Sequence, residues 1–158
     1  MLTPISISHA LTASPIEQAF QQAASDFGVP EHLLQALCYM EGRFSTHRGT
    51  PSIDGGYGCN LTKNSRIDTL DRAAQKLDVS PLRLQQDLRT NIGGAAYILS
   101  EDARQLSRSH ALPSNLAGWQ GALELYSNSR SPAIARLYAN EYSQRASVLL
   151  QIREKLSQ

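Results

Sequence analysis

The sequence predicts a mainly α-helical, compact single-domain bundle with one long glycine-rich loop. Apolar residues recur at three- and four-residue spacing along most of the chain. Three Ser-Pro pairs interrupt this pattern, and serine suits the N-cap of a helix while proline suits its first position. These pairs are Ser14-Pro15, Ser80-Pro81 and Ser131-Pro132. Residues 44–64 are rich in Gly, Ser, Thr and Pro and carry no helical stripe, which predicts the loop.

The size and charge of the chain limit its class. Its 158 residues, 41% of them hydrophobic, suffice for one core, so we expect an N-terminal extension at residues 1–13 and a single monomeric domain over residues 14–158. The formal charge is +1 and the basic residues are scattered, which argues against a nucleic-acid partner. No apolar run approaches the roughly 20 residues that span a bilayer. Residues 1–13 carry no signal-peptide pattern.

The first two helices have clear start and stop signals. Ser14 and Glu17 form a capping box ahead of an apolar stripe that ends at Gly28. Pro30 opens the second helix, and Gly42 is expected as its C-cap.

Helical spacing predicts the remaining helices. They are expected at about Leu70 to Leu77, Pro81 to Leu88, Asn91 to Leu106, Leu116 to Tyr126, and from Pro132 onward. Gly93 and Gly94 cost about 1 kcal/mol each against alanine inside a helix, which indicates that another element packs closely there. A short strand is considered only near Tyr57.

Glu41 is the most informative single residue. Leu34, Leu37 and Cys38 share its helical face, so the carboxyl group is expected on the last turn of a largely apolar helix, beside a loop. Burial and the negative end of the helix dipole would both raise its pKa, which suits a general acid. The alternative is an ordinary solvated glutamate near a helix end.

The cysteines and histidines bear on stability and metal binding. Cys38 and Cys59 either form a disulfide between the second helix and the loop, worth about 3 kcal/mol, or remain two small apolar residues. The sequence leaves both possibilities open. The histidines are dispersed and include no metal-type pair, so we expect no metal site and no cofactor.

Four segments follow one another along the chain in an order that bears on function. They are Glu41 itself, Gly55-Gly56-Tyr57-Gly58-Cys59-Asn60-Leu61, the segment from Asn91 to Leu99, and Leu125-Tyr126-Ser127. Over roughly residues 15–150 this order resembles the lysozyme-like superfamily of soluble lytic transglycosylases and goose-type lysozymes. Phe27-Gly28-Val29-Pro30, Tyr39-Met40-Glu41 and the run from Thr50 to Gly58 look closest to the lysozyme-like domain at the start of some bacterial N-acetylmuramoyl-L-alanine amidase precursors.

The resemblance implies a lysozyme-like fold and a peptidoglycan-cleaving glycosidase. Its partner would be the glycan strand, cut at the β-1,4 bond between N-acetylmuramic acid and N-acetylglucosamine in the cell wall, periplasm or extracellular space. Glu41 would serve as acid and then as base. A lytic transglycosylase needs only this carboxyl group, because the substrate's own N-acetyl and 6-hydroxyl groups replace the second carboxylate and the water. Its product is a 1,6-anhydro sugar.

Five further residues are candidates for the site. Asp54 would position a water in a goose-type hydrolase, or it is the first residue of an Asp-Gly turn. Tyr57 would stack on sugar, or it is an exposed turn tyrosine. Asn60 stands where the superfamily has a glutamine, in a motif one residue shorter. Asn91 would bind an acetamide or cap a helix. Tyr126 matches a tyrosine that holds the glutamate or the sugar.

Other functional classes stay open at this stage. A glycan-binding module without turnover is favoured by the shortened loop motif and opposed by the retained Glu41. Zinc amidase activity is not expected, because His9, His32, His47 and His110 offer no ligand set. An unrelated intracellular helical protein is the third possibility.

Overall fold

The computed structural model describes residues 13–158, so the expected extension at residues 1–13 and His9 lie outside the described part except for Ala13. The described part is mainly helical, as predicted. Its α-helices are α1 (Pro15–Phe27), α2 (Glu31–Gly42), α3 (Thr69–Leu77), α4 (Pro81–Gln86), α5 (Leu88–Leu106), α6 (Gln120–Tyr126) and α7 (Pro132–Leu156). Two 3-10 helices, η1 (His47–Gly49) and η2 (Leu116–Trp119), and two short strands, β1 (Gly56–Tyr57) and β2 (Leu61–Thr62), complete it.

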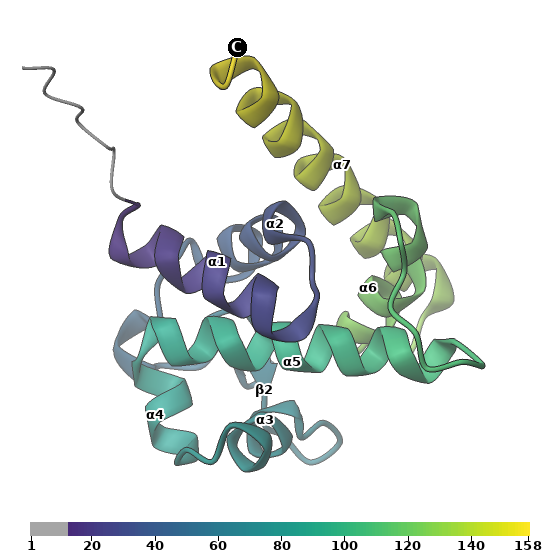
Figure 1. Ribbon diagram of the computed structural model, residues 1–158. Coiled ribbons are helices and arrows are strands. Elements are labelled where there is room, and N and C mark those ends of the chain that lie inside the picture. Colours follow the sequence, from purple (N-terminus) through teal and green to yellow (C-terminus); the bar gives the residue numbers. More distant parts are fainter. Residues whose placement is uncertain (1–12) are drawn as a thin grey trace, which may run out of the picture.

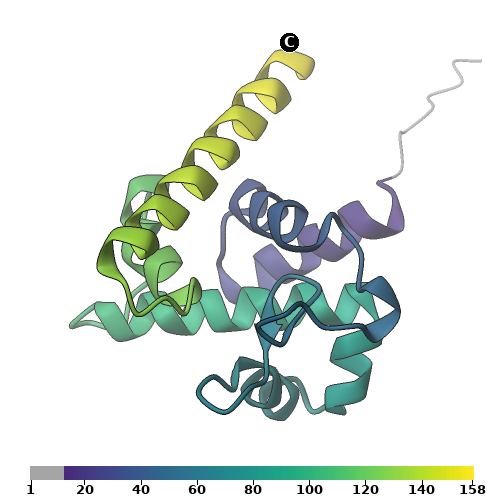
Figure 2. The same cartoon turned by 180° about the vertical axis from the view of Figure 1, so that it is seen from behind.

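Helix α5 is the central element of the bundle (Figure 1). Helices α1, α3, α4 and α6 all pack against it, while α2 packs against α7. The last turns of α7 extend away from the rest of the molecule (Figure 1). Seen from behind, the chain between α2 and α3 crosses in front of α5 (Figure 2). None of the described helices is both long and apolar enough to cross a membrane.

The three Ser-Pro starts are confirmed. Ser14, Ser80 and Ser131 are N-caps whose hydroxyls accept hydrogen bonds from the backbone N–H three residues further on, and a proline follows each. The capping box of Ser14 and Glu17 is complete. The sequence predicts these helix starts correctly because a cap involves only neighbouring residues.

The end of α2 differs from the prediction. Gly42 belongs to the helix, and Arg43 is the C-cap, with a left-handed φ of 53°. Glycine is needed at position 42 for space, because a Cβ there would lie 2.5 Å from the backbone oxygen of Gly58. The end of α2 and the following loop therefore pack backbone against backbone beside Glu41.

Three other expected helices also have different bounds. Helix α4 ends at Gln86 instead of Leu88, because Asp87 and Leu88 begin the next helix. Helix α5 begins at Leu88, not Asn91, because the side chain of Asp87 caps it by accepting a hydrogen bond from the Thr90 N–H. The expected helix from Leu116 to Tyr126 is divided into η2 and α6.

The close packing expected at the glycine pair is confirmed for Gly94. A Cβ at Gly94 would lie 2.7 Å from Leu61 Cδ1 of β2, whereas a Cβ at Gly93 would lie 3.8 Å from Leu77 Cδ1, an ordinary contact. Gly94 thus lets the strand pair approach the middle of α5.

The strand considered near Tyr57 is present as a small antiparallel hairpin. Tyr57 pairs with Leu61 and Gly56 with Thr62, so residues 58–60 form its turn. Gly58 and Asn60 have left-handed φ values of 57° and 68°, as a tight turn requires. This hairpin carries the glycine-rich motif toward the end of α2.

Candidate active site

Glu41 lies in the last turn of α2, where α2 packs on α7. Its side chain is half-buried, and one oxygen, Oε1, accepts two hydrogen bonds from tyrosines of α7. Tyr138 donates from 2.5 Å and Tyr142 from 2.8 Å. Burial is the largest cause that raises the pKa of both phenols, and the Glu41 carboxylate is the second. Both hydroxyls therefore remain hydrogen-bond donors across the physiological pH range. The carboxyl group is therefore held in one orientation.

Glu41 lines a groove of about 680 Å³ between the hairpin region and the loop that joins α6 to α7, which we call the Glu41 groove. Its chemically important lining residues are Glu41, Asp54, Asn60, Arg66, Arg130 and Tyr138. Serines, asparagines and Thr62 supply most of the remaining surface, with Ile67 and Ile134 as apolar lining. A groove of this polarity suits a ligand rich in hydroxyl and amide groups.

Three contacts at Cys59 hold the hairpin turn in place. It forms a disulfide with Cys38 of α2, with 4.3 Å between the two Cα atoms. Its N–H donates to Asn91 Oδ1 on α5 at 2.7 Å, and its carbonyl accepts from the Tyr126 hydroxyl on α6 at 2.6 Å. Of the two possibilities for Cys38 and Cys59, the disulfide is therefore the one present, and Cys38 lies one helical turn before Glu41.

The structure corrects the interpretation of Asn91 as a ligand-binding residue. Its side chain is fully buried inside α5, and it neither caps that helix nor lines the Glu41 groove. Besides accepting from Cys59, it donates to the carbonyls of Tyr57 at 3.0 Å and Leu84 at 2.9 Å. An asparagine amide provides the donors and the acceptor that these backbone groups need. Asn91 therefore anchors the hairpin.

Neither Tyr126 nor Tyr57 lines the Glu41 groove. Tyr126 is 3% exposed, and its hydroxyl donates to Cys59 rather than to Glu41. Burial, with a smaller contribution from Glu41, raises its pKa well above the ordinary value. The ring of Tyr57 packs against the hydrophobic core instead of lining the groove. Tyr126 therefore supports the hairpin turn, which corrects its expected role, whereas Tyr57 is a partly buried residue of the hairpin itself.

Asp54 and Asn60 do lie in the groove with Glu41. Asp54 is exposed in a turn in which the Gly55 N–H donates to the Ser52 carbonyl, and its own carbonyl accepts from Asn64 Nδ2 at 2.9 Å. The side-chain oxygen of Asn60 accepts from the Thr62 hydroxyl at 3.2 Å. Within the described residues, no hydrogen bond fixes the carboxylate of Asp54.

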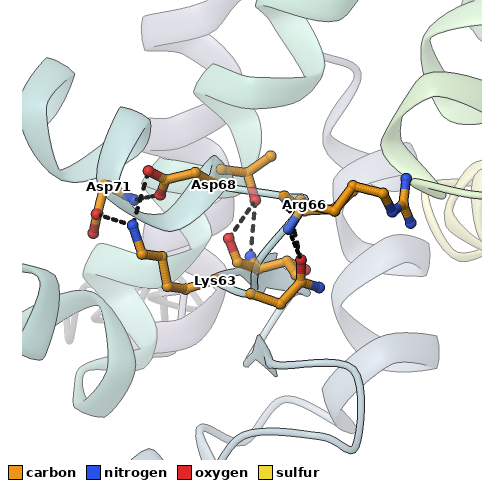
Figure 3. A network of polar contacts seen from close by, with 8 residues as sticks. Lys63, Arg66, Asp68 and Asp71 are labelled. Atoms are coloured by element: carbon orange, nitrogen blue, oxygen red, sulfur yellow. Dashed lines mark hydrogen bonds and ion pairs between the residues drawn. The ribbon is translucent and has the colours of Figure 1, made fainter.

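The charged residues beside the groove divide into two groups (Figure 3). Lys63 is paired with Asp68 at 2.9 Å and with Asp71 at 2.6 Å. The side chain of Arg66 points away from this cluster (Figure 3), and its guanidinium donates to the Asn128 carbonyl at 2.8 Å. Arg66 thus bridges the two walls of the groove.

The sequence interpretation missed the tyrosines that hold Glu41. Tyr138 and Tyr142 are spaced by four residues on α7; Tyr142 is buried and Tyr138 partly buried, and the other buried residues of that helix are Ala135, Ala139 and Ala146. Two tyrosines on a face of small residues need hydrogen-bond partners when they are buried, and this signal was available. What the sequence does not provide is the identity of the partner.

Within residues 13–158, no three His, Cys, Asp or Glu side chains are grouped to hold a metal ion. No known protein family model matches the chain, and no curated protein or solved structure matches it either. We therefore infer the function from the geometry of the Glu41 groove.

Proposed function

We propose that the protein cleaves the β-1,4 glycosidic bond of peptidoglycan between N-acetylmuramic acid and N-acetylglucosamine, as a lytic transglycosylase with Glu41 as the acid and base. The observation that carries this proposal is a half-buried carboxyl group, oriented by two tyrosine hydroxyls, in a polar groove. The motif order described above supplies the substrate class.

The hydrogen bonds of Glu41 suit proton transfer. Because Oε1 accepts from both Tyr138 and Tyr142, a proton on the carboxyl group is carried by Oε2. Glu41 would deliver this proton to the glycosidic oxygen as the sugar ring develops oxocarbenium character. The resulting carboxylate would then accept the proton of the substrate's 6-hydroxyl group, which closes the anhydro ring.

The surroundings of Asp54 favour transglycosylation over hydrolysis. A hydrolase of the inverting type needs a second carboxylate that holds a water in place. Asp54 is exposed, and no hydrogen bond or ion pair with another residue of 13–158 orients its carboxylate, whereas Glu41 is held by two donors. One oriented carboxyl group is what the transglycosylase reaction requires.

Clearing of purified cell-wall suspensions tests the proposal. The wild-type chain should lower the turbidity, and Glu41→Gln should do so at least about 100-fold more slowly, because general acid catalysis contributes that much or more. Glu154→Gln, at an exposed position near the end of α7, is the matched control and should behave as the wild type. Equal clearing by the wild type and Glu41→Gln would exclude Glu41 as the acid.

The goose-type hydrolase and the glycan-binding module give different results in the same assay. If the protein is a hydrolase that depends on Asp54, Asp54→Asn should lose activity and the released fragments should carry reducing ends. If it is a binding module, the chain should sediment with cell walls without clearing them. The transglycosylase proposal expects Asp54→Asn to retain at least about half of the wild-type rate, because Asp54 then takes no part in the proton transfers.

A further inference from the structure

A second hollow continues the Glu41 groove toward the loop before β1. It has a volume of about 750 Å³ and shares Asp54, Arg66 and Arg130 with the Glu41 groove. The two hollows therefore adjoin, and Glu41 lines only the first of them. A polymer bound across Glu41 would extend into the second hollow and pass both arginines.

Arg66 is held in place at the junction of the two hollows. Its backbone N–H and that of Ile67 donate to Asn64 Oδ1 at 2.8 and 2.7 Å, which fixes the turn that carries it. One guanidinium nitrogen donates to Asn128 at 2.8 Å. Because a guanidinium has five N–H donors, several remain for a ligand.

The charges of the two arginines are uncompensated within the described residues. Lys63, which also lines the second hollow, has both Asp68 and Asp71 as ion-pair partners. Among residues 13–158, no carboxylate lies within ion-pair distance of Arg66 or Arg130, although the exposed Asp54 lines the same hollow. Two unpaired guanidinium groups in one depression suit a carboxylate ligand.

This charge has no use in binding the sugars themselves. N-acetylglucosamine is neutral, and the lactyl carboxyl group of N-acetylmuramic acid is neutral while it is amide-linked to a peptide stem, so the free carboxylates of stem-bearing peptidoglycan are on the stems. We propose that Arg66 and Arg130 bind a carboxylate of the peptide stem, so that the protein selects peptide-substituted glycan over bare glycan. The inference rests on the proposed function, since it takes the groove ligand to be peptidoglycan.

Affinity measurements test this inference separately from turnover. The probes are soluble glycan oligomers that carry their peptide stems and, as the bare oligomers, N-acetylglucosamine oligomers of the same length, which carry neither a stem nor a lactyl carboxylate. Glu41→Gln serves as the parent, so that neither probe is consumed. Isothermal titration should show that the parent binds the peptide-bearing oligomers at least about tenfold more tightly, as expected for a charge-assisted hydrogen bond.

The arginine variants are made in this parent. Arg66→Gln and Arg130→Gln should each weaken binding of the peptide-bearing oligomers by about fivefold to tenfold. Binding of the bare oligomers should weaken by less than about twofold, because these offer the arginines no carboxylate. Arg108→Gln is the matched control, because Arg108 is exposed beyond the end of α5 and lines neither hollow. The exposed Arg130 side chain makes no hydrogen bond or ion pair with another residue of 13–158, so its replacement removes no such contact.

Each result of these titrations either supports or overturns the inference that Arg66 and Arg130 bind a stem carboxylate. Equal affinity of the parent for the two probes, equal weakening of both by the arginine variants, or no binding of either probe would overturn the inference. A peptide-dependent affinity that disappears in Arg66→Gln and Arg130→Gln would support it. If that affinity is found while the wild type releases no fragments from cell walls, the stem-binding inference stands and the proposed catalytic function fails.

Discussion

Tyr138 donates a 2.5 Å hydrogen bond to Glu41 from a position 97 residues further along the chain. Tyr142, one turn later on α7, donates to the same oxygen at 2.8 Å, and the two rings lie 4.2 Å apart. The packing of α7 on α2 thus determines the orientation of the Glu41 carboxyl group.

Removing either hydroxyl tests this positioning role. Tyr138→Phe and Tyr142→Phe keep the rings but leave Oε1 with one donor, so the rate of cell-wall clearing should fall by about tenfold in each variant. Turnover should fall while the Michaelis constant changes little, which mere loosening of the fold would not produce. Tyr39→Phe is the control, since Tyr39 is exposed on α2 and its hydroxyl makes no hydrogen bond to another residue of 13–158. Unchanged turnover in both variants would contradict the role.

Two glycine-to-alanine substitutions should have effects of opposite sign on the free energy of unfolding. Gly42→Ala places a Cβ 2.5 Å from the Gly58 oxygen and should destabilise the fold by roughly 2 kcal/mol. Gly93→Ala meets only Leu77 at 3.8 Å and should stabilise it by up to about 1 kcal/mol, because alanine favours the helix. Urea unfolding measures both, and a stable Gly42→Ala variant would exclude the backbone contact.

Loss of the disulfide should lower stability without unfolding the domain. Cys38 and Cys59 are 21 residues apart, and closing a loop of this length contributes about 3 kcal/mol in the chain-entropy estimate. A reductant should lower the free energy of unfolding of the wild type by this amount. The double variant Cys38→Ala and Cys59→Ala should already be less stable and should not respond to reductant. A thiol titration that finds two free cysteines without reductant would refute the bridge.

Because of Asp102, the free energy of unfolding should decrease as the pH rises. Burial within α5 raises its pKa from 3.8 to about 7, with Arg72 opposing and Glu101 adding to the shift. The unfolded chain therefore loses this proton at lower pH than the folded chain, so stability falls as the pH rises from about 4 to about 7. Above this range the full penalty, at most about 4 kcal/mol, remains.

The substitution Asp102→Asn measures this penalty. The variant should match the wild type at pH about 4 and exceed its free energy of unfolding at pH about 8, because asparagine carries no charge. Asp78→Asn, at the exposed C-cap of α3, should change stability by less than about 0.5 kcal/mol at both values. An Asp102→Asn variant that is no more stable than the wild type at the higher pH would argue against the penalty.

The fold could be predicted largely because its signals are local. The Ser-Pro caps, the capping box at Ser14 and the stop at Gly28 each depend on residues within one turn. The role of Gly42 could not be found in this way, since it depends on a contact with the Gly58 backbone across the fold. A glycine beyond an apolar stripe indicates a C-cap unless tertiary packing requires it elsewhere.

The candidate site was predicted only in part for the same reason. Glu41, Asp54 and Asn60 do share one groove, as expected from the motif order. The roles of Asn91 and Tyr126 differ from the expected ones, because both side chains form their hydrogen bonds with backbone groups of the hairpin. A motif identifies residue types in order, but it does not distinguish a residue that contacts a ligand from one that supports the contacting loop.

The most direct test of the central claim is mass spectrometry of the fragments released from purified cell walls by the wild type and by Glu41→Gln. We predict 1,6-anhydro fragments from the wild type and, within the same incubation, at least about 100-fold fewer from Glu41→Gln. Fragments with reducing ends only, or equal amounts of anhydro fragments from both proteins, would contradict the assignment of Glu41 as the acid of a lytic transglycosylase.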